Sequence, residues 1–128
     1  MKLFFDEDTG GSVPRALRAI GIRDSDWVGK DRCIKPGTYN EDWLPYVGQN
    51  GYLLISCNRA ILRAEAQRSI LIRERLGAVF LASGKETRFS VLRLLLNRWQ
   101  WLEAIDANEP RPFAYLLYAS GMKQRYRL

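Results

Sequence analysis

The stretch LFFDEDTGGS, residues 3–12, places three apolar residues directly before three acids and a pair of glycines. The apolar residues predict a short buried strand over residues 2–5, and the acids begin where that strand ends. Such crowding is unexpected in a chain whose net charge is +6. The acids at the end of this strand therefore require a specific physical reason.

Apolar segments recur along the chain and predict further buried strands at residues 52–56, 78–82 and 113–118. Segments with apolar residues at helical spacing alternate with these strands, at residues 13–20, 41–49, 59–77 and 86–107. Continuously apolar strands that alternate with helices are typical of an α/β fold with a mostly parallel sheet. We expect one domain over residues 1–128.

Several finer features of these elements are also predicted. We expect Ser12 and Asn40 to cap their helices, and the helix over residues 59–77 to break near Ser69. A strand is expected near Trp27–Val28, and the basic tail KQRYRL either contacts a polyanionic or acidic partner or has no fixed structure. The long helix over 86–107 is expected to bury an apolar stripe that comprises Phe89, Leu92, Leu96, Trp99, Leu102 and Ile105.

Composition excludes several kinds of chemistry. The chain has no histidine, and its two cysteines, Cys33 and Cys57, are too far apart for a CxxC site, so we expect neither a disulfide nor a typical zinc site. Catalysis must then use carboxylates, amides, hydroxyls, lysine or arginine. No apolar run approaches the roughly 20 residues that span a bilayer, and the N-terminus does not resemble a signal peptide. We therefore expect a cytoplasmic protein.

The position of the acids indicates a binding site. In a parallel sheet, ligands bind beyond the carboxyl ends of the strands. Asp6 and Asp8 follow the first strand, Asn58 follows the strand over 52–56, and Asn40 at a helix start could converge on them. Crowded carboxylates repel one another unless a cation lies between them, and Mg²⁺ or Mn²⁺ is the usual choice. The alternative is structural: Glu7 points away and Asp8 bonds a turn amide.

Two families with acids at this strand end match poorly. The DEDTG segment transposes the last two positions of the DxDGT motif of haloacid-dehalogenase-like phosphatases, in which Asp6 would be the nucleophile. Receiver domains also group acids there, but they require an aspartate after the third strand and a lysine after the fifth. The downstream residues that either family needs have no convincing match here. A phosphatase therefore remains only a weak alternative.

A third family fits over nearly the whole chain. FFDEDT, NEDWLPYVGQNGYLLISCNRAI, GAVFLASGKE, LRLLLNRWQWLEA and PRPFAYLLYASGMK occur in the order seen in PIN-like domains grouped with VapC-type toxins. The sequence resembles that family, and the resemblance implies a three-layer α/β/α PIN-like fold. It also implies an endoribonuclease that depends on Mg²⁺ or Mn²⁺, usually a toxin neutralised by an antitoxin protein. A homodimer would be consistent with this resemblance.

The resemblance assigns three catalytic positions, but two of them lack the family's acid. Asp6 matches the first acid, whereas Asn40 and Asn58 stand where the family has aspartate in its Asp-x-x-Trp and x-Asp-Arg motifs. These three residues, together with Asp8, form the expected metal site. An amide has the same reach with one charge fewer, so we expect intact folding and weak or absent activity. A silencing substitution or natural loss would each explain the pattern, unless Asp8, Glu41 or Asp42 replaces the missing acids.

Two arginines are candidates for contacts with RNA. Arg59 directly follows position 58, and Arg63 lies four residues later on the same helical face, so both could bind substrate phosphates. The alternative is a solvated face with local ion pairs. The rival function is a PIN-like module that binds RNA or an antitoxin without catalysis. Binding of that kind would depend on salt and not on Mn²⁺.

Overall fold

The computed structural model describes residues 1–29, 34–82 and 87–128. Within these ranges no helix is long and apolar enough to cross a membrane, and no disulfide forms. Cys33 lies outside the described residues, as does Glu86, the predicted first residue of the long helix.

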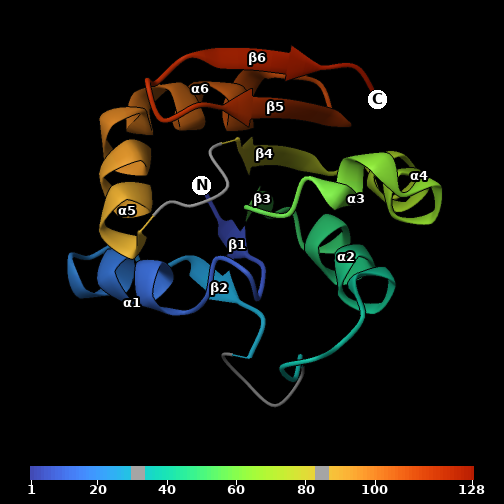
Figure 1. Ribbon diagram of the computed structural model, residues 1–128, viewed down its shortest axis with the longest axis horizontal. Helices are drawn as coiled ribbons and strands as arrows, with labels where there is room; N and C mark the ends of the chain where they lie inside the picture. The colour runs from blue at the N-terminus through green and yellow to red at the C-terminus, as the bar shows by residue number, and fades with distance from the viewer. Residues whose placement is uncertain (30–33, 83–86) are drawn as a thin grey trace.

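One six-stranded sheet organises the chain, in the order β2-β1-β3-β4-β5-β6 (Figure 1). Its strands are β1 (Leu3–Phe5), β2 (Ser25–Trp27), β3 (Leu53–Ser56), β4 (Gly77–Leu81), β5 (Phe113–Leu117) and β6 (Lys123–Tyr126). All neighbouring strands run parallel except β5 and β6, which are antiparallel. The mostly parallel sheet expected from the sequence is confirmed.

Helices cover both faces of this sheet. They are α1 (Ser12–Ala19), α2 (Asn40–Gln49), α3 (Ala60–Arg63), α4 (Glu65–Arg73), α5 (Arg88–Asn97) and α6 (Trp99–Asn108). Leu3 and Phe5 pack with α1, α5 and α6, whereas Phe4 between them packs with α2, α3 and α4. In Figure 1, α1 and α5 lie at the left, α6 runs along the top beside β5 and β6, and α2, α3 and α4 lie at the right. Helices thus cover both faces of the sheet, which confirms the predicted α/β/α layers.

The first strand lies where the direction of the chain through the sheet reverses. From β1 the chain adds β2 on one side, and then β3, β4 and β5 on the other. Phe5 is level with Ile55 of β3, and the Asp6 amide donates a hydrogen bond to the Ile55 carbonyl over 3.4 Å. Such a reversal leaves a crevice at the carboxyl ends of the two strands. The acids of residues 6–8 begin there.

Both predicted helix caps are wrong by one residue. Ser12 is the first residue of α1, which follows Gly11 without a side-chain cap. Asn40 is the first residue of α2, and its side-chain oxygen accepts a hydrogen bond from Trp43 Nε1 instead of from a helix amide. Pro45 is accommodated inside α2.

The predicted breaks in the helical segments also differ from those in the structure. The segment over 59–77 breaks at Ala64, whose ψ of 115° is extended, and not near Ser69. The predicted long helix is two helices that meet at Arg98, whose Nε donates to the Gly121 carbonyl over 2.9 Å. This contact with the β5–β6 turn is a tertiary interaction that helical spacing alone does not reveal.

The predicted apolar stripe of the long helix is only partly buried. α5 packs Val91, Leu94 and Leu95 against the sheet, and leaves Phe89 72% and Leu96 41% exposed. The prediction that Phe89 and Leu96 belong to the core is therefore wrong, because the helix buries a neighbouring face. The basic tail is ordered as β6, an edge strand of the sheet.

Candidate active site

Asp6 is the buried centre of the candidate site. Its side chain follows β1 and is only 3% exposed. The Thr9 amide and hydroxyl donate to Asp6 Oδ1 over 2.9 and 2.6 Å, and the Ser56 hydroxyl at the end of β3 donates to Asp6 Oδ2. Hydrogen bonds from two segments therefore hold the carboxyl group in one orientation.

Burial raises the pKa of Asp6 above its ordinary value, because the charged form loses hydration. The hydrogen bonds from Ser56 and Thr9 oppose this rise, and the nearby charge of Asp8 adds to it. The net result is a carboxyl group that is protonated more readily than an ordinary aspartate. A cation at the same place would compete with that proton.

Asn58 is joined to Asp6 through the end of β3. Its backbone amide donates to Ser56 Oγ over 2.9 Å, and the same hydroxyl donates to Asp6. Asn58 Oδ1 accepts a hydrogen bond from the Ala60 amide over 3.1 Å, at the start of α3. The side-chain oxygen of Asn58 thus has a structural partner already. The structure brings two of the three predicted catalytic positions, 6 and 58, into one network.

Asn40 belongs to a second network. Its Oδ1 accepts from Trp43 Nε1 over 3.1 Å, and its Nδ2 donates to Gln67 Oε1 over 3.2 Å. Trp43 is buried and its ring stacks on that of Phe4 in β1, with the ring centroids 5.6 Å apart. Asn40 is therefore held near β1 through Trp43, but none of its hydrogen bonds to described residues reaches Asp6.

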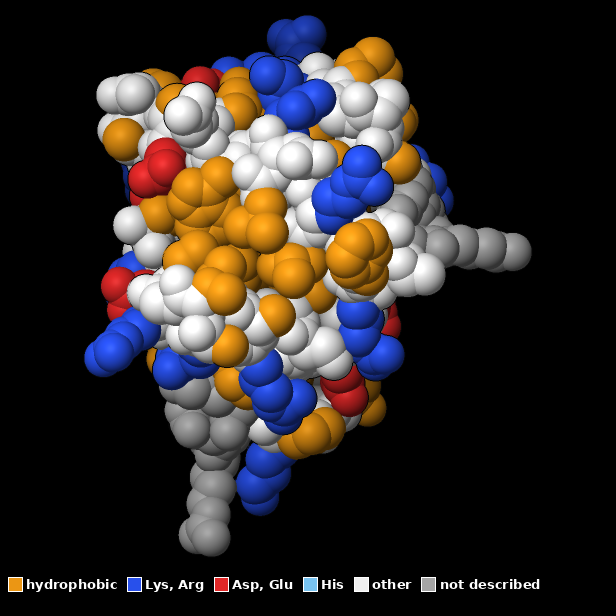
Figure 2. Space-filling view, turned by 90° about the vertical axis from the view of Figure 1, so that its left-hand side faces the viewer, with side chains coloured by type: hydrophobic (Ala, Val, Ile, Leu, Met, Phe, Trp, Pro, Cys, Tyr) orange, Lys and Arg blue, Asp and Glu red, His pale blue; other side chains and the backbone are white. Residues whose placement is uncertain are grey.

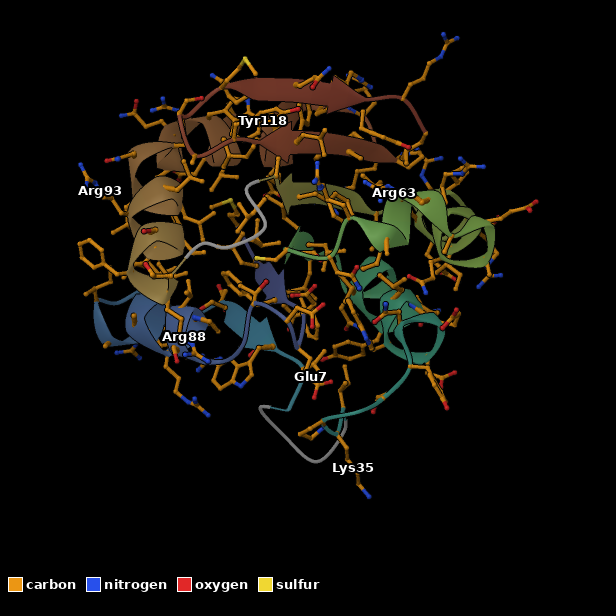
Figure 3. All side chains as sticks on the ribbon, in the orientation of Figure 1. Glu7, Lys35, Arg63, Arg88, Arg93 and Tyr118 are labelled. Carbon is orange, nitrogen blue, oxygen red and sulfur yellow. The ribbon has the colours of Figure 1, made fainter. Side chains whose placement is uncertain are left out.

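The neighbouring acids divide between the site and its surroundings. Glu7 is exposed and accepts the Gly37 amide over 2.9 Å, so it faces the loop before α2, as the alternative interpretation predicted (Figure 3). The Gly10 amide donates to the Asp6 carbonyl, so the turn does not use Asp8 there. Asp8 and Asp42 are exposed.

The side chains that could hold an ion are few. Among residues 1–29, 34–82 and 87–128, no three His, Cys, Asp or Glu side chains are grouped to hold a metal. Mg²⁺ typically uses one or two protein carboxylates and several waters. Asp6, with Asp8 nearby, fits this minimal requirement. Any ion would therefore be held weakly and would depend on amide and water oxygens.

Three residues of the site were missed by sequence reasoning. Thr9 and Ser56 were assigned only to a turn and a strand, yet both bind the Asp6 carboxyl group. Their sequence signal is a hydroxyl beside each strand end: Thr9 lies three residues after Asp6, and Ser56 is the last residue of an apolar strand. Arg88 was also missed, because it belongs to a distant helix.

Arginines lie on both sides of the site. A Cβ atom at Gly10 would lie 3.8 Å from Arg88 Nη2, so Arg88 reaches across the glycine loop that follows Asp6. Arg59 is half-buried and Arg63 exposed, beside and within α3 on the opposite side (Figure 3). Phosphates could approach the site between these side chains.

Comparison with known families identifies the fold. The model of a family described as PIN like domain matches residues 1–83. The chain belongs to this PIN-like domain family. The matched part runs from β1 through β4, and therefore includes positions 6, 40 and 58. No curated protein and no solved structure gives a significant match to this PIN-like domain.

Proposed function

We propose that this PIN-like domain is a VapC-type endoribonuclease dependent on Mg²⁺ or Mn²⁺, attenuated by Asn40 and Asn58. The observation that carries the proposal is the buried Asp6 carboxyl group at the reversal of the sheet, hydrogen-bonded to the end of β3. Within the family resemblance, the role would be that of a toxin whose antitoxin is a separate protein.

The proposed site would hold a divalent ion through oxygen atoms. Asp6 and Asp8 would supply carboxylates, and positions 40 and 58 would complete the set only when they carry aspartate. A bound cation would neutralise charge on the phosphodiester and activate a water molecule. Thr9 and Ser56 orient the Asp6 oxygens, while Arg59, Arg63 and Arg88 would hold RNA phosphates on either side.

Hydrogen bonding explains why two amides would weaken the site. Asn58 Oδ1 accepts from the Ala60 amide, and Asn40 Oδ1 accepts from Trp43. The other side-chain atom of each residue is an NH₂ group, which cannot ligate a cation. An aspartate could keep the same acceptor contact with one oxygen and offer the second oxygen, with its charge, to the ion. Asn40→Asp and Asn58→Asp should therefore preserve local structure and restore ligands.

Cleavage of a mixed RNA substrate tests the proposal. We expect the Asn40→Asp/Asn58→Asp variant to cut RNA with Mn²⁺ about 100-fold faster than the unaltered chain, because loss of a group that merely orients a metal ligand already costs roughly 10- to 100-fold. EDTA should abolish the activity. The control is Asn97→Asp/Asn108→Asp, which adds two charges at exposed positions on α5 and α6 and should leave the rate unchanged.

The other outcomes of this assay separate the rival functions. Fast EDTA-sensitive cleavage by the unaltered chain would contradict attenuation and require ligands other than residues 40 and 58. If neither protein cuts RNA, the nuclease proposal fails. RNA binding that weakens with added salt and does not depend on Mn²⁺ would then support a non-catalytic module. Turnover of a phosphomonoester with intact RNA would instead favour the phosphatase alternative.

A further inference from the structure

An apolar stripe on α5 borders the core and is largely exposed at its two ends. Phe89, Leu92 and Leu96 lie three and four residues apart and so share one face of the helix. Phe89 is 72% exposed and Leu96 41% exposed, whereas Leu92 between them is half-buried. We refer to these three residues as the α5 stripe. It extends about 10 Å along the helix, which is two turns.

Hollows at both ends of the α5 stripe enlarge this surface. At the N-terminal end, a hollow of about 140 Å³ lies between α1 and α5 and is lined by Val13, Ala16, Phe89 and Leu92. At the C-terminal end, a wider depression includes Leu96 and Trp99. Figure 2 shows that apolar side chains form a continuous patch on this side of the molecule. Patches of this kind mark interaction sites on proteins.

The border of the α5 stripe is positively charged. Arg88 lines the hollow, and Arg93 lies one turn after Phe89 on the same side of the helix. Both are exposed, and neither forms a salt bridge with a described residue. Arg93 extends outward from α5 in Figure 3. A partner that covers the stripe must therefore supply carboxylates beside its apolar residues.

Charge and geometry select the kind of partner. A second copy joined through the same face would bring Arg88 and Arg93 near their own equivalents, which like-charge repulsion disfavours. An added strand would need a free sheet edge, but the edges are β2 and β6, and this face consists of helices. A helix fits, because its side chains can pack between α1 and α5.

We propose that the α5 stripe, with Arg88 and Arg93, is the docking site for an acidic amphipathic helix of a partner protein. The helix would place apolar side chains in the hollow and over Leu96, and carboxylates against the two arginines. This docking does not require nuclease activity, but it shares Arg88 with the proposed RNA-binding surface.

A defined peptide provides the test. The probe is an 18-residue synthetic helix built on a seven-residue repeat. Leucine occupies the first, fourth and fifth positions of each repeat, so that leucines recur at i, i+3, i+4 and i+7, and glutamate occupies the positions that flank this apolar face. Binding is measured by calorimetry and by fluorescence anisotropy. We expect Phe89→Ser and Leu96→Ser each to weaken binding about tenfold, the typical effect of losing an interface anchor. Because both side chains are exposed, circular dichroism should show unchanged folding.

Charge reversal makes the test specific. Arg93→Glu should weaken binding of the glutamate peptide about tenfold and should strengthen binding of the same peptide carrying lysine in place of glutamate. The matched controls are Ile72→Ser on α4, an exposed apolar residue of the opposite layer, and Arg127→Glu in the C-terminal tail. Both controls should change the affinity less than twofold.

Three results would overturn the proposal. The first is no binding at millimolar peptide. The second is equal loss of binding in the control variants, which would indicate non-specific attraction to a basic protein. The third is a dimer in sedimentation equilibrium that Phe89→Ser converts to a monomer, because the stripe would then hold a second copy.

Discussion

Asp6→Asn in the Asn40→Asp/Asn58→Asp variant is expected to lower Mn²⁺-dependent RNA cleavage by about 1000-fold, or about 4 kcal/mol of transition-state stabilisation. Asp6 is the buried carboxylate of the site, and Ser56 and Thr9 orient it. Its amide would keep one oxygen for Thr9 and turn an NH₂ group toward Ser56, so the fold would remain while a ligand is lost. Initial rates at saturating Mn²⁺ provide the measurement. Unchanged cleavage would remove Asp6 from the site.

The same substitution should stabilise the unaltered chain when metal is removed with EDTA. Because the pKa of Asp6 is raised in the folded state, the unfolded chain loses this proton first as pH rises. Folding therefore becomes less favourable from the ordinary pKa of aspartate up to the raised pKa, and the penalty then stays constant. Asp6→Asn removes it, so we expect a higher Tm than that of the unaltered chain at pH 7 and little difference near pH 3, where Asp6 is protonated in both states. A lower Tm at every pH would contradict the burial argument.

Gly77→Val is expected to cause the largest loss of stability, about 3 kcal/mol or more. Gly77 begins β4 and pairs with Phe113 of β5. A Cβ atom at Gly77 would lie 2.5 Å from Phe113 Cζ, which is too close for two carbon atoms that are not bonded. Phe113 is only 2% exposed, so its ring has no room to move aside. The ring would have to leave its place in the core. Urea denaturation measures the loss as a shift of the midpoint.

A second substitution should confirm the cause. Phe113→Leu shortens the side chain opposite Gly77, so the double variant should be more stable than the sum of the two single effects predicts. Gln124→Val is the control, since it places the same side chain on an exposed position of β6 and should change stability by less than about 0.5 kcal/mol. Additive effects would show that Gly77 and Phe113 do not touch as described.

The alternation of apolar strands with helices was sufficient to predict the layers and the mostly parallel sheet. It could not locate the breaks at Ala64 and Arg98, because both helical segments keep their apolar spacing across the break. Arg98 bonds the turn after β5. The face of α5 was misjudged for a related reason. Leucines occupy more than one side of that helix, so spacing alone could not show that Phe89 would be exposed.

Part of the candidate site was predictable, because the ends of strands can be located from the sequence. Asp6 and Asn58 were expected together, since parallel strands place their carboxyl ends at one edge, and the structure joins them through Ser56. The convergence of Asn40 was expected from a family pattern, and the structure instead gives it Trp43 and Gln67 as partners. Hydrogen bonds between side chains depend on rotamers that a linear sequence does not specify. The metal-binding role of these residues remains a prediction.

A calorimetric titration of Mn²⁺ in the absence of RNA tests the central claim most directly. We expect the Asn40→Asp/Asn58→Asp variant to bind one ion at least about 100-fold more tightly than the unaltered chain, and we expect the addition of Asp6→Asn to abolish this binding. If the unaltered chain and the double variant bind Mn²⁺ equally, or if neither binds it, the end of β1 is not an attenuated metal site.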